Sequence, residues 1–252
     1  RNSDNNLSVI PGGYIKYDFQ ANHNEASSCN INNKRYIIIS PTNCNFNFSK
    51  EWVEIIKNIC TEFCNYTIIL RPHPEDDKFK LIAQDLKDSI NNLKLDLNQS
   101  DTKAFDQALL VISDFSGVSF SASMKNRVPN LQLAFTNQSL KKAKEIISHD
   151  AKLLKGGNLR EYELGIVVFN FEQINMAVNK LIADNFYWHQ KISLNRKNLV
   201  PNFGKAADYF VDNIPTIASG LSADNWVTIA KSNQSTNKFE YVDYLKCQNK
   251  LM

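Results

Sequence analysis

The sequence lacks both a strong charge excess and a long apolar run. Its formal net charge is only +3 over 252 residues, so the overall field gives no strong reason to expect a nucleic-acid-binding protein. Hydrophobic residues make up 43% and charged residues 22%, which is ordinary for a soluble globular protein and too polar for a membrane-spanning one. The first residues contain neither an initiator Met nor an apolar segment. We therefore expect no signal peptide or anchor in this sequence, and a fragment of a longer protein is one interpretation.

The sequence also lacks the cysteine pattern of a disulfide-stabilised protein. Its five cysteines are odd in number and irregularly spaced, which favours free thiols and a reducing, cytoplasmic compartment. Cys60 and Cys64 would share one face of a helix, where a metal ion could bind, but no second ligand pair with metal spacing lies nearby. We therefore predict that both pack as small apolar residues and that there is no metal site.

Two common nucleotide-binding fingerprints are absent. The sequence has no GxGxxG pattern, and no GxxxxGK pattern followed by Ser or Thr. It therefore supports neither a Rossmann dinucleotide fingerprint nor a P-loop. We predict no separate cofactor.

Short β-branched runs alternate with amphipathic segments along most of the chain. The run 35–40 is continuous and apolar, as expected for a strand buried on both faces of a parallel sheet, and the apolar residues after Ser49 follow the helical period. This alternation predicts a doubly wound α/β fold, with a parallel sheet, right-handed crossovers and helices on both faces. We expect strands at 35–40, 66–70, 93–97, 108–112, 129–133 and 166–169, and helices at 49–63, 77–90, 102–107, 118–125, 138–149 and 171–184.

The two ends of the sequence differ from this central region. The tripeptide Pro11-Gly12-Gly13 interrupts a short apolar piece and is typical of a turn that approaches another group closely. Apolar residues from Phe203 to Ile214 predict a closing helix that Pro215 ends, and the residues beyond are polar and patchy. We predict an interdomain segment and linker at 1–34, a Rossmann-like domain with this helical extension at 35–215, and a tail at 216–252.

Three loops follow the carboxyl ends of predicted strands, where open parallel sheets bind their ligands. They are 40–43, 71–76 and 113–117. In the last of these, the Ser116 hydroxyl, the backbone N–H groups and the dipole of the following helix could bind phosphate, and Gly117 would let the backbone approach it. The alternative is that Ser113, Asp114 or Ser116 only caps the helix.

The loop Arg71-Pro72-His73-Pro74 combines a permanent cation with a titratable imidazole, and the two prolines stiffen its backbone. Arg71 could bind phosphate through two hydrogen bonds, and His73 could donate to a phosphate oxygen or act as general acid for a leaving group. The alternative is a structural turn, in which His73 bonds to the backbone and Arg71 pairs with Glu75 or Asp76.

Taken together, the segments 11–18, 71–74 and 113–118 resemble the donor half of CDP-glycerol glycerophosphotransferases, the teichoic acid and capsule polymerases of GT-B type. The likeness spans roughly Val9 to Ile214. It implies that 35–215 is a nucleotide-donor-binding domain and that His73 is catalytic. The donor-binding residues that it implies are Arg71, Pro74, Ser113, Asp114, Ser116, Gly117, Thr42 and Gly13. The chain departs from the family pattern in having Phe115 for a Tyr and Gly117 for a second Ser.

The resemblance implies a transferase that moves glycerol-phosphate or a sugar from a CDP-type nucleotide, such as CDP-glycerol, to a cell-surface polymer. It implies a polymer or lipid-linked acceptor, an N-terminal acceptor domain that this sequence does not contain, and no nucleic-acid partner. A cytoplasmic protein, with room for peripheral association at the inner face of the membrane, fits this function. The alternatives are a capsule or lipopolysaccharide glycosyltransferase with another nucleotide sugar, a sugar-nucleotide epimerase, and a non-catalytic nucleotide-binding domain.

Overall fold

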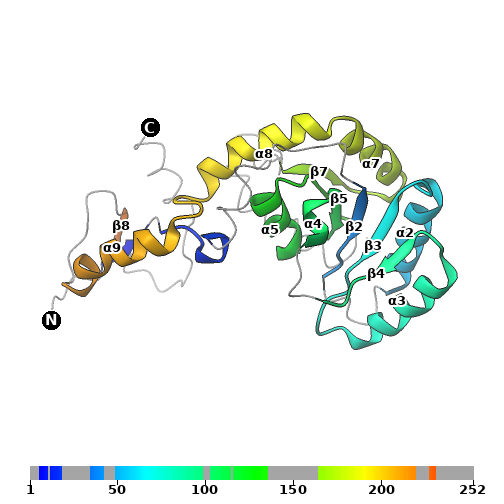
Figure 1. The fold of residues 1–252 in the computed structure, drawn as a ribbon, viewed down its shortest axis with the longest axis horizontal. Helices are drawn as coiled ribbons and strands as arrows, with labels where there is room; N and C mark the ends of the chain where they lie inside the picture. The colour runs from blue at the N-terminus through cyan, green and yellow to red at the C-terminus, as the bar shows by residue number, and fades with distance from the viewer. Residues whose placement is uncertain are drawn as a thin grey trace. The chain divides into compact units, whose positions relative to one another are not determined.

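A computed structural model describes residues 6–10, 12–18, 35–42, 49–98, 103–114, 116–135, 164–219 and 227–230. The chain divides into two compact units, which we describe separately (Figure 1). Unit 1 consists of Arg1–Asn22 and Val200–Met252, and unit 2 of His23–Leu199.

Unit 2 is built on a six-stranded parallel sheet. Its strands are β2 (Tyr36–Ile39), β3 (Thr67–Leu70), β4 (Leu93–Leu95), β5 (Ala108–Ser113), β6 (Asn130–Leu133) and β7 (Gly165–Val168), in the spatial order β4-β3-β2-β5-β6-β7. Every residue of β5 is buried, and so are the last three of β2 and of β3. Continuous apolar runs form such strands because both of their faces are covered.

Helices cover both faces of this sheet (Figure 1). The larger apolar cluster contains side chains of α2 (Ser49–Glu62), α3 (Asp77–Ser89) and α7 (Ile174–Ala183). The smaller cluster contains side chains of α4 (Lys103–Asp106) and α5 (Gly117–Asn126). Successive residues of β2 point to opposite faces, so Ile37 and Ile39 lie in the first cluster and Ile38 in the second. The predicted doubly wound α/β fold is confirmed.

The strand order places a topological switch point between β2 and β5. From β2 the chain proceeds through β3 to β4 at one edge, whereas from β5 it proceeds through β6 to β7 at the other. After the carboxyl ends of β2 and β5, the chain therefore proceeds toward opposite edges of the sheet. Such crevices are where open α/β sheets bind ligands.

One predicted helix differs from the observed one, and one observed helix was not predicted. The segment predicted as a helix at 171–184 is a 3₁₀ turn, Phe171–Gln173, followed by α7. A second helix that we did not predict, α8 (Asn185–Leu199), comes directly after it. Its apolar pattern is misleading, because Asn185 and His189 are buried while Phe186 is exposed. The helix predicted at 138–149 lies outside the described residues.

Unit 1 joins the two ends of the sequence. Strand β1 (Asn6–Val9) pairs antiparallel with β8 (Val227–Ala230), and a 3₁₀ turn, η1 (Ile15–Tyr17), contacts α9 (Ala206–Ala218). The carboxylate of Asp18 caps α9, since its oxygens accept from the backbone N–H groups of Ala206, at 3.0 Å, and Ala207, at 2.6 Å.

The structure changes one prediction for α9. Pro215 does not end this helix, which continues to Ala218. Proline removes only its own N–H donor, and its carbonyl still accepts from the Ser219 N–H at 3.0 Å, so the last turn survives. The helix belongs to unit 1, together with the N-terminal segment.

Gly13 has a close neighbour in the same unit. Its φ is +82°, and an added Cβ would lie 2.2 Å from the carbonyl oxygen of Pro201. Only glycine fits this backbone conformation without strain. The predicted close approach of this turn is thus an approach to the chain itself, which accounts for Gly13 without a ligand.

Candidate functional site

The loops on either side of the switch point are joined by hydrogen bonds. The buried carboxylate of Asp114, after β5, accepts from the backbone N–H and from Oγ1 of Thr42, after β2, both at 2.8 Å. Nearby, Ser113 Oγ donates to the carbonyl of Ser40 at 2.8 Å. Thr42, Ser113 and Asp114, which we predicted to bind the donor, therefore hold the two loops together at the switch point.

The start of α5 presents an unused backbone donor. Ser116 is its N-cap, with Oγ accepting from the Val118 N–H at 3.3 Å, so the capping interpretation is confirmed for this residue. Gly117 is the first helical residue and is exposed, and an added Cβ would have no atom within 4 Å. The Gly117 N–H has no partner in the part of the chain that the structure describes. An anion could reach it without obstruction and would meet the positive end of the helix dipole.

His73 lies half-buried in the loop after β3. The backbone N–H of Glu75 donates to His73 Nδ1 at 3.2 Å, and the carbonyl of His73 accepts from the Asp76 N–H at 3.0 Å. Because Nδ1 is an acceptor, the neutral ring carries its proton on Nε2. The loop is the structural turn that we considered, and it also leaves His73 with an N–H donor for a ligand.

Arg71 forms a different ion pair from the one that we considered for it. Its side chain is only 3% exposed, and Nη1 lies 2.6 Å from Oδ2 of Asp96, with the guanidinium 4.9 Å from the centre of the Phe105 ring. The partner is thus neither Glu75 nor Asp76. In the parallel pairing of β3 with β4, Leu70 lies opposite Leu95, so the next residues, Arg71 and Asp96, come together.

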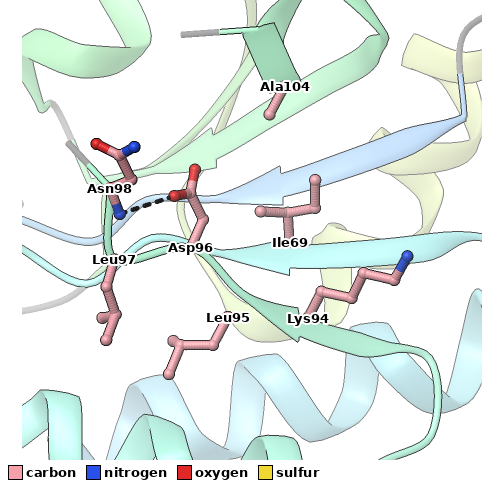
Figure 2. A pocket seen from close by; sticks show the side chains of 7 residues that line it. All are labelled: Ile69, Lys94, Leu95, Asp96, Leu97, Asn98 and Ala104. Carbon is pink, nitrogen blue, oxygen red and sulfur yellow. Dashed lines mark hydrogen bonds between the residues drawn. The ribbon is translucent and has the colours of Figure 1, made fainter. Parts of the chain in front are cut away.

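A pocket of about 400 Å³ opens beside this ion pair, and sequence reasoning missed it (Figure 2). Figure 2 shows the Asn98 N–H donating to Asp96 Oδ1, at 3.0 Å, on the loop after β4. Asp96 therefore connects the pocket wall to the buried Arg71. The wall combines aliphatic side chains with two charged residues and an amide: Ile69, Lys94, Leu95, Asp96, Leu97, Asn98 and Ala104.

These features share one rim of the sheet. Strands β3, β2 and β5 are consecutive and parallel, so their following loops open at the same edge. Strands lie ~4.8 Å apart, which puts the start of the His73 loop roughly 10 Å from the start of the Ser113–Gly117 loop. His73 and Gly117 are both accessible to solvent there. Gly13 belongs to unit 1.

Two features are absent from the described residues. These residues contain no group of three or more His, Cys, Asp or Glu that could hold a metal ion. None of their helices has both the length and the apolar character needed to cross a membrane.

The six-stranded parallel sheet with helices on both faces defines a Rossmann-like α/β domain. No protein-family model matches the sequence, and no curated protein matches it. Among solved structures, the chain is similar to the Staphylococcus aureus MnaA–UDP co-structure, with 15% identity over 82% of this chain and 54% of that one, and a TM-score of 0.52.

Two further structures are similar. A Listeria monocytogenes protein assigned as a UDP-N-acetylglucosamine 2-epimerase has 16% identity over 84% of this chain and 54% of its own, with a TM-score of 0.52. A variant of the wall teichoic acid polymerase TagF, soaked with CDPG, has 19% identity over 85% and 52%, with a TM-score of 0.49. The chain thus spans about half the length of each of these structures.

Proposed function

We propose that this chain binds the diphosphate of a nucleotide-activated donor at the switch-point rim and serves as the donor half of a transferase. The observation that carries this proposal is a pair of N–H donors at one edge of the sheet: the Gly117 backbone N–H and His73 Nε2. Both are accessible, and neither donates to another described residue. A diphosphate supplies acceptor oxygens for both donors.

The two donors have different tasks in this proposal. The start of α5 binds one phosphate through the Gly117 N–H and the helix dipole. His73 donates from Nε2 to the phosphate that becomes the leaving group. When an acceptor hydroxyl displaces this nucleotide, negative charge develops on the leaving phosphate oxygen, and the hydrogen bond from His73 Nε2 stabilises this charge.

The nucleoside has a suitable place in the pocket of Figure 2. Its aliphatic wall offers contact area for a base or ribose, and Asn98 lies on the same wall for hydrogen bonding. The carboxyl end of β4 is three strand spacings from that of β5, or roughly 14 Å, which is comparable to the length of an extended nucleoside diphosphate. Arg71 has a supporting role in this arrangement, because its ion pair with Asp96 holds the pocket wall.

The proposed donor is CDP-glycerol, because the loops that carry His73 and Gly117 resemble those of glycerophosphotransferases. Transfer would form a bond between an acceptor oxygen and the phosphorus of the glycerol-phosphate group. The bond from that phosphorus to the bridging oxygen would break, CMP would leave with the bridging oxygen, and the proton of the acceptor hydroxyl would be released to solvent. The acceptor on this proposal is a cell-surface polymer or its lipid-linked precursor, for a cytoplasmic enzyme at the inner face of the membrane. A second candidate is sugar-nucleotide epimerisation, favoured by the similarity to the Listeria monocytogenes protein assigned as a UDP-N-acetylglucosamine 2-epimerase.

Calorimetry tests this proposal on the 252-residue chain. CDP-glycerol, a CMP-sugar and UDP-N-acetylglucosamine would be titrated in turn, and we expect binding of at least the first. His73→Ala should weaken it by about tenfold, the value of one hydrogen bond to a charged group, or ~1.4 kcal/mol. Glu75→Ala is the matched control, since the bond to His73 Nδ1 comes from the Glu75 backbone. No heat from any of the three ligands would refute the proposal.

The same titrations separate the two candidate functions. Preference for CDP-glycerol over the UDP-sugar supports the transferase. Preference for UDP-N-acetylglucosamine, together with an epimerised product in NMR spectra recorded without any acceptor, supports the epimerase and refutes glycerol-phosphate transfer.

A further inference from the structure

Helix α5 contacts the neighbouring strand β6 through two buried hydroxyl groups as well as through apolar side chains. Ser116, Ser119 and Ser123 are all buried. Among the large apolar residues of this helix, only Met124 is buried. Two amide side chains of the neighbouring strand β6 complete the contact: Gln132 Nε2 donates to Ser119 Oγ at 2.8 Å, and Asn130 Nδ2 donates to Ser123 Oγ at 2.9 Å. Hydrogen bonds have a direction that apolar contacts do not have.

The donor and the acceptor of each hydrogen bond in this contact are determined. Ser119 Oγ donates its single hydrogen to the carbonyl oxygen of Ser116, at 2.7 Å, so towards Gln132 it can only accept. The relay therefore runs from the Gln132 amide, through the Ser119 hydroxyl, to the Ser116 carbonyl. The other relay runs from Asn130 through Ser123 to the carbonyl of Val128, at 2.6 Å, just beyond the far end of α5.

The first relay ends on the peptide that carries the proposed phosphate donor. The Ser116 carbonyl and the Gly117 N–H belong to one planar trans peptide, so they point in opposite directions. A hydrogen bond that fixes the carbonyl also fixes the direction of the N–H. It polarises the peptide as well, which strengthens the N–H as a donor.

We propose that Gln132 is a positioning residue for phosphate binding and acts through Ser119 on the Gly117 N–H. This inference rests on the proposed function. The Asn130–Ser123 relay has the same chemistry at the other end of the helix, and on this proposal it contributes only to the stability of the fold. Donor groups held by a fixed second layer of hydrogen bonds need no reorganisation when the ligand arrives.

Matched pairs of variants of the full chain test the inference. Gln132→Leu and Ser119→Ala break the first relay, whereas Asn130→Leu and Ser123→Ala break the second. We expect all four variants to lower the melting temperature. Only the first pair should also weaken the binding of UDP and CDP, by about tenfold in Kd measured by calorimetry. The second pair should change it less than twofold.

An NMR measurement adds a direct view of the donor. In the parent chain the Gly117 amide proton should shift downfield when the preferred diphosphate is added, and this shift should be smaller in Gln132→Leu or Ser119→Ala. If the parent binds neither UDP nor CDP, both the proposed function and the relay are wrong. If the parent binds and both pairs of variants lose affinity equally, or not at all, the relay is wrong and the proposed function stands.

Discussion

The two faces of the sheet in unit 2 hold their helices in different ways. On one face, α2, α3 and α7 contribute to a large cluster of buried aliphatic and aromatic side chains. On the other, the apolar cluster is small, and α5 is joined to β6 through Ser119 and Ser123. Apolar burial stabilises without fixing direction, whereas hydrogen bonds fix it. The face that carries the proposed phosphate donor is the one that is fixed by hydrogen bonds.

The largest effect should come from the apolar face. Trp52 of α2 is fully buried in the large cluster, so Trp52→Ala should lower the free energy of unfolding by ~4 kcal/mol through lost contacts and the cavity that remains. Urea unfolding followed by circular dichroism measures this. Phe120→Ala is the control on α5, where the ring is exposed and we expect a change of less than about 0.5 kcal/mol. Equal losses in the two variants would contradict the comparison.

An intermediate effect should come from the ion pair beside the small cluster. Arg71→Met keeps much of the side-chain length but leaves Asp96 without its cation, which should cost ~2 kcal/mol of unfolding free energy. This is less than for a fully buried pair, because Asp96 is 20% exposed and water can solvate it. Lys80→Met removes the pair with Asp77, which is 90% exposed, and should cost less than about 0.5 kcal/mol. A double-mutant cycle with Asp96→Asn isolates the pair, and a coupling near zero would show that it contributes little.

The smallest effect is a difference in alkylation rate between two cysteines, which reports how tightly α2 packs on the sheet. Burial raises the pKa of the Cys60 thiol to about 11, so at pH 8 almost none of it is thiolate, the reactive form. Cys64, just past the end of α2, is exposed. Iodoacetamide at pH 8 should therefore label Cys64 well before Cys60, as measured by peptide mass spectrometry. Labelling of both at the same rate would show that this face opens readily.

The strands could be predicted because their sequences are unambiguous. Runs such as Ile37-Ile38-Ile39 and Leu109-Leu110-Val111-Ile112 are too short for amphipathic helices and have no polar interruption. The rim followed from the strands, because loops after parallel strands open at their carboxyl ends. The positions of His73 and Gly117 on that rim could therefore be predicted, while a role for them in binding stays a prediction.

Other features depend on partners far away in the sequence. The ion pair of Arg71 with Asp96 needs the register of β3 with β4, and the pocket beside it needs the same pairing. The pairing of β1 with β8 joins the ends of the chain and has no local signal. In α8 the buried positions include Asn185 and His189, so its hydrophobic pattern does not show which face packs inward.

The cap that Asp18 places on α9 has a consequence for biosynthesis. The two residues that this bond joins, Asp18 and Ala206, are 188 positions apart. At about 5–20 residues per second, a ribosome needs roughly 10–40 s to make the intervening chain. During that time the six strands of the parallel sheet in unit 2 are made, whereas β1 and Asp18 still lack their partners β8 and Ala206. The contacts between the two segments of unit 1 therefore form after the sheet of unit 2 has been synthesised.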